Sequence, residues 1–177
     1  MIKIMKYGAI SPDEIFARNE SELDVSDIVA DIIADVRKNG DAALIAYAKK
    51  FDKADLTCLE VTDEEIEEAF RSVEPEFVEI LKEAAVNIRT FHEKQLRQGF
   101  AIQQENGVVI GQKITPIEKV GLYVPGGTAA YPSTVLMDAI PAKIAGCPEL
   151  GMTTPPNKEG KGNPVILAAA KILFFFS

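Results

Sequence analysis

Residues 119–134 read KVGLYVPGGTAAYPST, and no other stretch of the chain is better suited to hold a ligand. The apolar run at 119–124 predicts a strand, and the apolar pattern that follows this segment predicts a helix. Between them, Gly126 and Gly127 lack a Cβ, so the backbone there can adopt positive φ and approach a ligand closely. A strand, a glycine loop and a helix in this order are typical of sites for phosphate-bearing ligands.

The residues on either side of the glycines fit the same chemistry. Tyr123 ends the predicted strand with an aromatic face and a hydroxyl, which suit a base or a ribose. Ser133 or Thr134 is expected to cap the helix, whose first N–H groups can face an anion. The spacing matches neither the G-x-G-x-x-G fingerprint nor the P-loop, so a plain connection between two elements stays the alternative.

The other chemistry-bearing residues favour structural roles. His92 is the only histidine, and with no metal-ligand spacing around it a solvated or cap-bonded helix residue is expected. The acidic run TDEEIEEAF at 62–70 is expected to be a solvated face at a helix N-terminus. Lys143 could support a phosphate or carboxylate, although reaching into solvent is the favoured interpretation. The residues by themselves offer no catalytic residue and no metal ligand.

The composition excludes several classes of function. Of 177 residues, 47% are hydrophobic and 26% charged, as in ordinary globular proteins. A net charge of −8 argues against nucleic acid and against a basic membrane-surface helix. Cys58 and Cys147 favour buried thiols over a disulfide. The start has no signal-peptide pattern, and the last 13 residues are too few to span a bilayer, so the cytoplasm is the expected compartment.

The periodicity changes near residue 100. Before it, helices are expected with turns and one short strand, CLEV, between them; the expected helices are 27–39, 42–51, 62–70 and 76–97. After Gly99, two strands joined by an Asn106-Gly107 turn come first. Strands at 119–124 and 149–154 then alternate with helices at 133–146 and 164–172, which predicts βαβ units and a parallel sheet. Two parts are expected, 1–99 mainly helical and 100–177 the start of an α/β domain.

Four longer stretches are distinctive: VGLYVPGGTAAYPSTVLMDAIPAKIAGCPELGMTTPP at 120–156, DVRKNGDAALIAYAKKFD at 35–52, IRTFHEKQ at 88–95 and NPVILAAAKI at 163–172. Together these stretches resemble histidinol dehydrogenases. The resemblance implies an α/β, Rossmann-like parallel sheet similar to that of aldehyde dehydrogenases, here incomplete, preceded by a helical region. It also implies a zinc-dependent homodimer that oxidises L-histidinol through histidinaldehyde to L-histidine with two molecules of NAD, in histidine biosynthesis.

The resemblance assigns roles to a few residues of the glycine loop. In that family the tyrosine of the Y-V-P-G-G segment contacts NAD, which implies the same for Tyr123. Pro125, Gly126 and Gly127 are expected to shape the same cofactor pocket. The family's zinc ligands and its Glu-His acid–base pair lie in later segments, so neither is expected in this chain.

The length and the last residues raise a further expectation. Members of the family run well over twice this length, and LFFFS replaces the usual continuation after residue 172, which suggests a truncated chain that is inactive alone. A frameshift, a premature stop or a natural short form would each give such an end. The alternatives are a non-catalytic or split-enzyme subunit, which pairs through its sheet edge and Phe174–Phe176, and a relative that oxidises another small alcohol.

Overall fold

The computed structural model describes residues 4, 6, 8–16, 24–126 and 130–175, without the side chains at 15, 16, 174 and 175. Contacts group the chain into two compact units, Met1–Gly40 and Asp41–Ser177, and each is described by itself. Among the described residues, no helix has the length and apolar character that a membrane span requires. Whether 1–99 and 100–177 are separate domains stays a prediction.

The first unit consists of the short helix α1, Pro12–Phe16, and the longer α2, Ser26–Asn39. The sequence predicts an apolar face on α2, and its isoleucines and valines do recur at helical spacing. None of its residues is buried within this unit, and Ile28 remains 61% exposed. Gly40 ends the helix at a φ of 57°, with its N–H donating to Val36 O.

The second unit begins with three helical segments. Helix α3, Asp41–Tyr47, runs directly into a π-helical turn, η1, Ala48–Asp52, and α4 covers Asp63–Ser72. Thr62 is the N-cap of α4, and its side chain accepts the Glu65 N–H at 3.2 Å. The strand predicted at CLEV is wrong, because residues 53–62 form a loop between η1 and α4.

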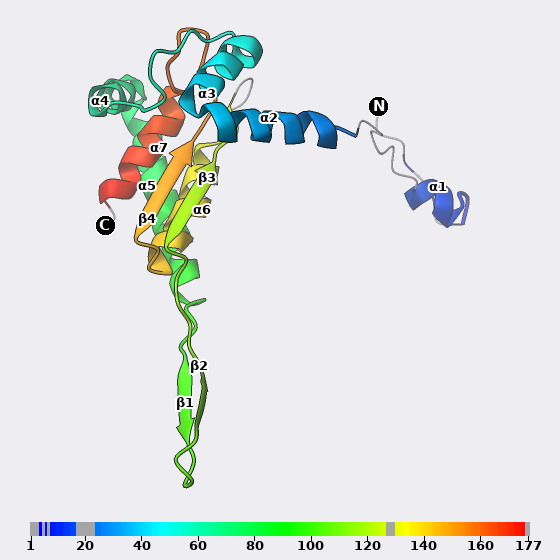
Figure 1. The fold of residues 1–177 in the computed structure, drawn as a ribbon, viewed down its shortest axis with the longest axis vertical. Coiled ribbons are helices and arrows are strands. Elements are labelled where there is room, and N and C mark those ends of the chain that lie inside the picture. The colour runs from blue at the N-terminus through cyan, green and yellow to red at the C-terminus, as the bar shows by residue number, and fades with distance from the viewer. Residues whose placement is uncertain (1–3, 5, 7, 17–23, 127–129, 176–177) are drawn as a thin grey trace. The chain divides into compact units, whose positions relative to one another are not determined.

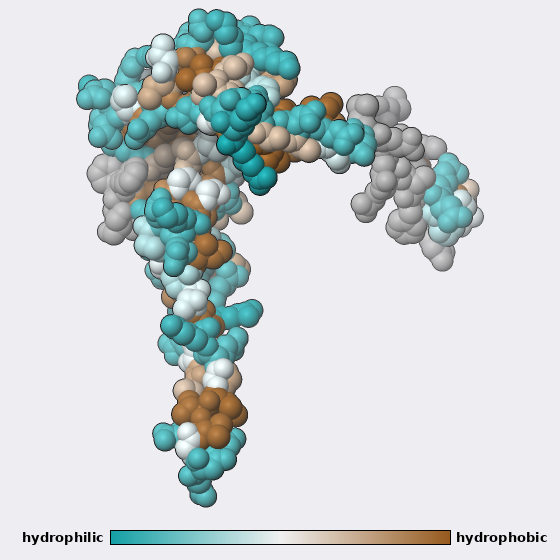
Figure 2. Space-filling model, in the orientation of Figure 1, coloured by the Kyte–Doolittle hydropathy of each residue, from teal (hydrophilic) through white to brown (hydrophobic). Residues whose placement is uncertain are grey.

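Helix α5, Pro75–Glu93, is the longest element and ends four residues before the predicted end. Strands β1, Phe100–Gln103, and β2, Val109–Gln112, form an antiparallel hairpin, as predicted. Residues 104–108 connect the two strands, and the Gly107 N–H, at a φ of 86°, donates to Gln104 O within this connection. All eight strand residues are exposed, and Figure 2 shows their apolar side chains as a hydrophobic patch.

The α/β part is a single parallel βαβ unit followed by a helix. Strand β3, Lys119–Tyr123, pairs in parallel with β4, Glu149–Thr153, and α6, Pro132–Ile144, connects them. Helix α7, Pro164–Phe175, follows β4. The predicted α/β class with a helical region before it is therefore confirmed.

One core holds this unit together. Helices α5, α6 and α7 lie on one face of the β3–β4 pair (Figure 1). Strand residues at alternate positions, such as Leu122, point into this core, whereas Lys119, Gly121 and Tyr123 stay exposed on the other face. The largest fully buried side chains are Val124, Val135, Leu136, Ile140, Ile166 and Ile172.

Candidate functional site

Tyr123 lies where the sequence places it, at the carboxyl end of β3. The residue is 63% exposed, and its Cα partner across the ladder is Thr153, the last residue of β4. Beyond the strand, the Val124 N–H still donates to Thr153 O at 2.9 Å. Ligands of open α/β sheets bind outside the carboxyl ends of the strands, so Tyr123 lies at the edge where a ligand is expected.

The loops that leave β3 and β4 pack against each other at Gly126. A Cβ at this position would lie 3.3 Å from Pro155 Cδ and 3.5 Å from Thr154 Oγ1. Pro125, the preceding residue, is exposed, and Gly127 lies outside the described residues. A side chain at Gly126 would therefore be crowded by the neighbouring loop, which is a packing reason for glycine at this position.

Thr154 carries an unusual polar atom beside this contact. Its Oγ1 is buried and has no hydrogen-bond partner among the described residues. Buried hydroxyls without a partner are uncommon in native structures because the desolvation is not compensated. A donor or acceptor brought in by a ligand, with a small shift of the loop, would satisfy it.

A cavity of about 890 Å³ opens beside Tyr123. One wall consists of Tyr123 and residues 152–156 at the end of β4. The other wall comes from α3, η1 and the loop that follows them. This volume lies within the range of about 300–1,000 Å³ that is usual for small-molecule and cofactor sites.

The start of α6 differs from the predicted one. The N-cap is Tyr131, which makes no side-chain cap hydrogen bond, and Pro132 occupies the first turn. The predicted cap at Ser133 or Thr134 is wrong, because the helix begins at Pro132, whose fixed φ suits the first helical position and which has no N–H that would need an acceptor. Ser133 is consequently an exposed residue of the first helical turn, not a cap.

The acidic run at 62–70 is more than a solvated face. Glu65 Oε1 accepts the Gly162 N–H at 3.1 Å, and Glu68 Oε2 lies 2.9 Å from Lys161 Nζ. Hydrogen bonds to Lys171 hold the pKa of Glu67 below its usual value. Helix α4 therefore fixes α7 and the loop before it, which contributes Gly162 to the cavity lining.

Lys143 adopts neither of the two roles weighed from the sequence. Its Nζ donates to Leu173 O at 2.7 Å, near the C-terminal end of α7. Burial lowers the pKa of this amine, and the nearby Arg89 charge lowers it further. Lys143 therefore links α6 to α7 through a main-chain carbonyl, where a cation suits the helix dipole.

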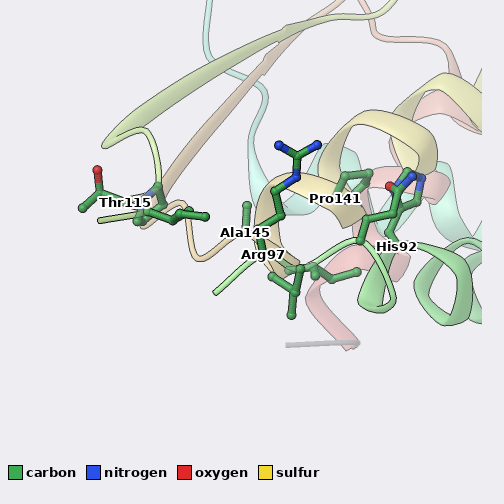
Figure 3. Close-up of a pocket in the computed structure, with 10 residues that line it drawn as sticks. His92, Arg97, Thr115, Pro141 and Ala145 are labelled. Atoms are coloured by element: carbon green, nitrogen blue, oxygen red, sulfur yellow. The ribbon is translucent and has the colours of Figure 1, made fainter. Parts of the chain in front are cut away.

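A second cavity, of about 390 Å³, lies at the C-terminal end of α6. Figure 3 shows His92 from α5 and Arg97 from the segment after it, with Pro141 and Ala145 beside them. Because α6 runs antiparallel to β3, this end lies near the amino ends of the strands, away from Tyr123. His92 Nδ1 is 2.6 Å from Gln95 Oε1, which agrees with a bonded helix histidine.

The described part of the chain offers no set of side chains that could bind a metal ion. No group of three or more His, Cys, Asp or Glu side chains there lies close enough together to hold a metal ion. Both cysteines are free thiols, and the predicted burial is wrong for Cys58, which is exposed. The neighbouring residues 57, 59 and 60 of its loop are exposed as well.

Similarity to known proteins identifies the family of the chain. The family model for histidinol dehydrogenase matches residues 16–174. The chain belongs to the histidinol dehydrogenase family. Because the match covers nearly the whole chain, the resemblance noted in the sequence is confirmed. The proteins of this family are oxidoreductases.

Individual relatives agree with this assignment. The histidinol dehydrogenase of Clostridium acetobutylicum is 45% identical, with 97% of this chain and 41% of the relative aligned. That of Methanocaldococcus jannaschii is 47% identical over 97% of this chain and 40% of its own length. The crystal structure of histidinol dehydrogenase from Elizabethkingia anophelis superposes with a TM-score of 0.82 at 40% identity, covering 89% of this chain and 36% of that one. The chain therefore spans about 40% of the length of these two curated histidinol dehydrogenases.

Family membership leaves the individual site residues as predictions. Of the four residues expected to bind the cofactor, Tyr123 lines the larger cavity, and Gly126 packs on Thr154 and Pro155, which also line it. The sequence interpretation missed the opposite wall, including Tyr47 and Phe51. Two aromatic residues four positions apart at the end of a helix were the available signal, but they are equally typical of a core face.

Proposed function

We propose that this chain forms the NAD-binding part of a histidinol dehydrogenase, the enzyme activity that oxidises L-histidinol to L-histidine. Family membership supports the reaction class, and one observation supports the cofactor site. That observation is the exposed ring of Tyr123 at the carboxyl end of β3, beside a cavity of about 890 Å³.

The residues around this cavity fit a dinucleotide. Tyr123 offers a ring face and a hydroxyl, and the buried Thr154 Oγ1 has no partner among the described residues. NAD, when bound, accepts the hydride, whereas the role of these residues is to bind and orient it and to exclude water.

Zinc does not fit the described residues, because they offer no donor set for a metal ion. No step of the oxidation is therefore assigned to side chains of this chain. We expect the purified chain to form no NADH from L-histidinol with added zinc. Clear turnover in that assay would contradict this expectation and would show that the chain carries its own acid–base groups.

The cofactor site is tested by isothermal titration of NAD into the purified chain. Tyr123→Ala is expected to weaken NAD binding by about ten-fold, since aromatic stacking of a base contributes about 1–3 kcal/mol. Tyr123→Phe separates the ring from its hydroxyl. Phe91→Ala removes an exposed ring that does not line the cavity and serves as control. Equal affinity in wild type and Tyr123→Ala would overturn the site.

A second candidate function is that of a partner subunit, favoured by the open face of the β3–β4 pair. Lys119, Gly121 and Tyr123 of β3 are exposed on this face, as are Glu149 and Thr153 of β4. Parallel sheets are usually covered on both faces, so a second polypeptide could cover the open face of this strand pair. Co-purification with a chain that carries the remaining part of a histidinol dehydrogenase would support this role. A monomer that stays alone when the two are mixed would exclude it.

A further inference from the structure

The loop between β4 and α7, residues 154–163, lies at the edge of the sheet where a ligand is expected. Its residues that line the larger cavity are Thr154, Pro155, Pro156, Glu159, Gly160 and Gly162. Within this β4–α7 loop, Asn157 Oδ1 accepts the Lys161 N–H at 2.8 Å, so the chain turns back on itself there. The position of the loop therefore determines part of the cavity wall.

Helix α4 holds the far end of the β4–α7 loop through a carboxylate. Thr62 caps α4 by accepting the Glu65 N–H at 3.2 Å, which is the first half of a capping box. In the second half of such a box, the glutamate side chain turns back to the N–H of the cap residue. Here Glu65 Oε1 accepts the Gly162 N–H at 3.1 Å, from a residue 97 positions along the chain. The carboxylate thus binds the β4–α7 loop from the end of another element.

A second contact joins the same helix to the same part of the loop. Lys161 Nζ lies 2.9 Å from Glu68 Oε2, and this hydrogen bond raises the pKa of the lysine. Both side chains are more than half exposed, so the ion pair contributes little by itself. The Glu65 bond is part-buried and closely packed, since a Cβ on Gly162 would lie 3.0 Å from Leu167 Cδ1. Glu65 is therefore the stronger of the two contacts.

We infer that Glu65 is a positioning residue, whose carboxylate fixes the β4–α7 loop so that the loop forms one wall of the ligand site. Its hydrogen bond to a main-chain N–H is charge-assisted, and a part-buried N–H that loses its acceptor favours an open loop. An open loop binds a ligand less tightly, because binding has to order it first. This inference rests on the proposed NAD site and adds what holds one of its walls.

Amide exchange and NAD titration of the purified chain test this role. Glu65→Ala removes the acceptor, so we expect the Gly162 amide to exchange about ten-fold faster by nuclear magnetic resonance. We expect NAD to bind this variant several-fold more weakly. Glu65→Gln keeps an oxygen in the place of Oε1, and it is expected to restore both the slow exchange and the NAD affinity of the wild type.

The matched control is Glu67→Ala on the same helix, because the partner of Glu67 is Lys171 of α7, outside the β4–α7 loop. This variant loses an ion pair, yet its Gly162 exchange rate and its NAD affinity are expected to stay within about two-fold of the wild type. A purely structural role of the α4 carboxylates would instead change both alanine variants alike, and that result would overturn the inference.

The two measurements separate this inference from the proposed function. Equal exchange of the Gly162 amide in wild type and Glu65→Ala would overturn it, whatever the NAD affinity. Faster exchange with unchanged NAD affinity would also overturn the positioning role. So would weak NAD binding by Glu65→Gln with slow exchange, because the ligand would then contact the charge itself. No NAD binding by the wild type would overturn the proposed function and the positioning role with it, whereas the exchange rates would still show the contact between α4 and the loop.

Discussion

Gly126 shows how a single residue connects the glycine loop to the neighbouring loop. The sequence indicates that a ligand can approach the backbone here, and the structure adds that Pro155 and Thr154 already do. A side chain at this position would press on the loop after β4 before it met any ligand. The residue therefore controls the shape of one wall of the larger cavity.

Gly126→Ala tests this control. The new Cβ would lie 3.3 Å from Pro155 Cδ and 3.4 Å from Pro155 O, so the loop must shift by a few tenths of an ångström. We expect several-fold weaker NAD binding and a loss of about 1 kcal/mol in the free energy of unfolding. Titration calorimetry and urea denaturation measure the two effects.

Gly121→Ala is the matched control, because a Cβ there would meet nothing within 4 Å on the exposed sheet face. We expect it to leave NAD affinity unchanged and to stabilise the strand slightly. If both variants lose affinity equally, the packing at Gly126 is not the cause.

The pair formed by Glu67 and Lys171 predicts a dependence of stability on pH. The folded-state pKa of Glu67 lies below its usual value of 4.5 because Lys171 donates to its carboxylate. The stabilisation is therefore present above pH 4.5 and is lost as the pH falls through the folded-state pKa. Thermal unfolding should show Glu67→Gln less stable than wild type at pH 7, with the difference shrinking below pH 4.5.

Glu64 on the same helix provides the control, since it makes no ion pair among the described residues. Glu64→Gln should change the melting temperature little at either pH. A Glu67→Gln difference that stays constant down to pH 3 would show that the ion pair does not contribute.

At the scale of elements, α6 carries much of the core between the sheet and the other helices. Its buried residues are Val135, Leu136, Ala139 and Ile140. The neighbouring Met137 is 57% exposed. Adjacent positions of one helix therefore differ sharply in how much free energy their side chains contribute.

Leu136→Ala is expected to lower the free energy of unfolding by about 3 kcal/mol, because it opens a cavity in a fully buried position. Met137→Ala should cost no more than about 0.5 kcal/mol. Urea denaturation followed by circular dichroism measures both. Equal losses in the two variants would mean that α6 does not pack on the sheet as described.

The helices and strands were predictable where the hydrophobic periodicity of the sequence was clear. The βαβ order after residue 119 and the hairpin around Gly107 follow from short apolar runs separated by glycine and proline, and both are confirmed. The strand predicted at CLEV does not form, because four residues without a neighbouring strand to pair with cannot make a ladder. The end of α5 at Glu93 was predicted four residues too late, at residue 97, because no glycine directly after Glu93 marks the C-terminus in the sequence.

At the scale of the molecule, the site was predictable on one side only. Tyr123 and Gly126 belong to one continuous motif, so the sequence alone predicted their place after the first parallel strand, and their role in cofactor binding stays a prediction. Tyr47 and Phe51 line the same cavity from more than 70 positions earlier in the chain, and their spacing alone does not distinguish a cavity wall from a core face. The ion pairs of the α4 glutamates were not predicted either, since their partners Lys161 and Lys171 lie far along the chain, in α7 and the loop before it.

The exposed hairpin has a consequence for how the molecule opens locally. Its strand residues pack on no core, whereas Ile166 and Ala168 of α7 are fully buried. Segments with few buried apolar contacts open at low free energy while the rest stays folded. We expect the ladder amides of β1 and β2 to exchange with deuterium within seconds, and those of α7 only after hours. Mass spectrometry of exchanged peptides measures this, and equal protection of both segments would contradict it. If the expected difference is found, the hairpin and the helical core are separate cooperative units. The cavity beside Tyr123 is then supported by the slowly exchanging unit.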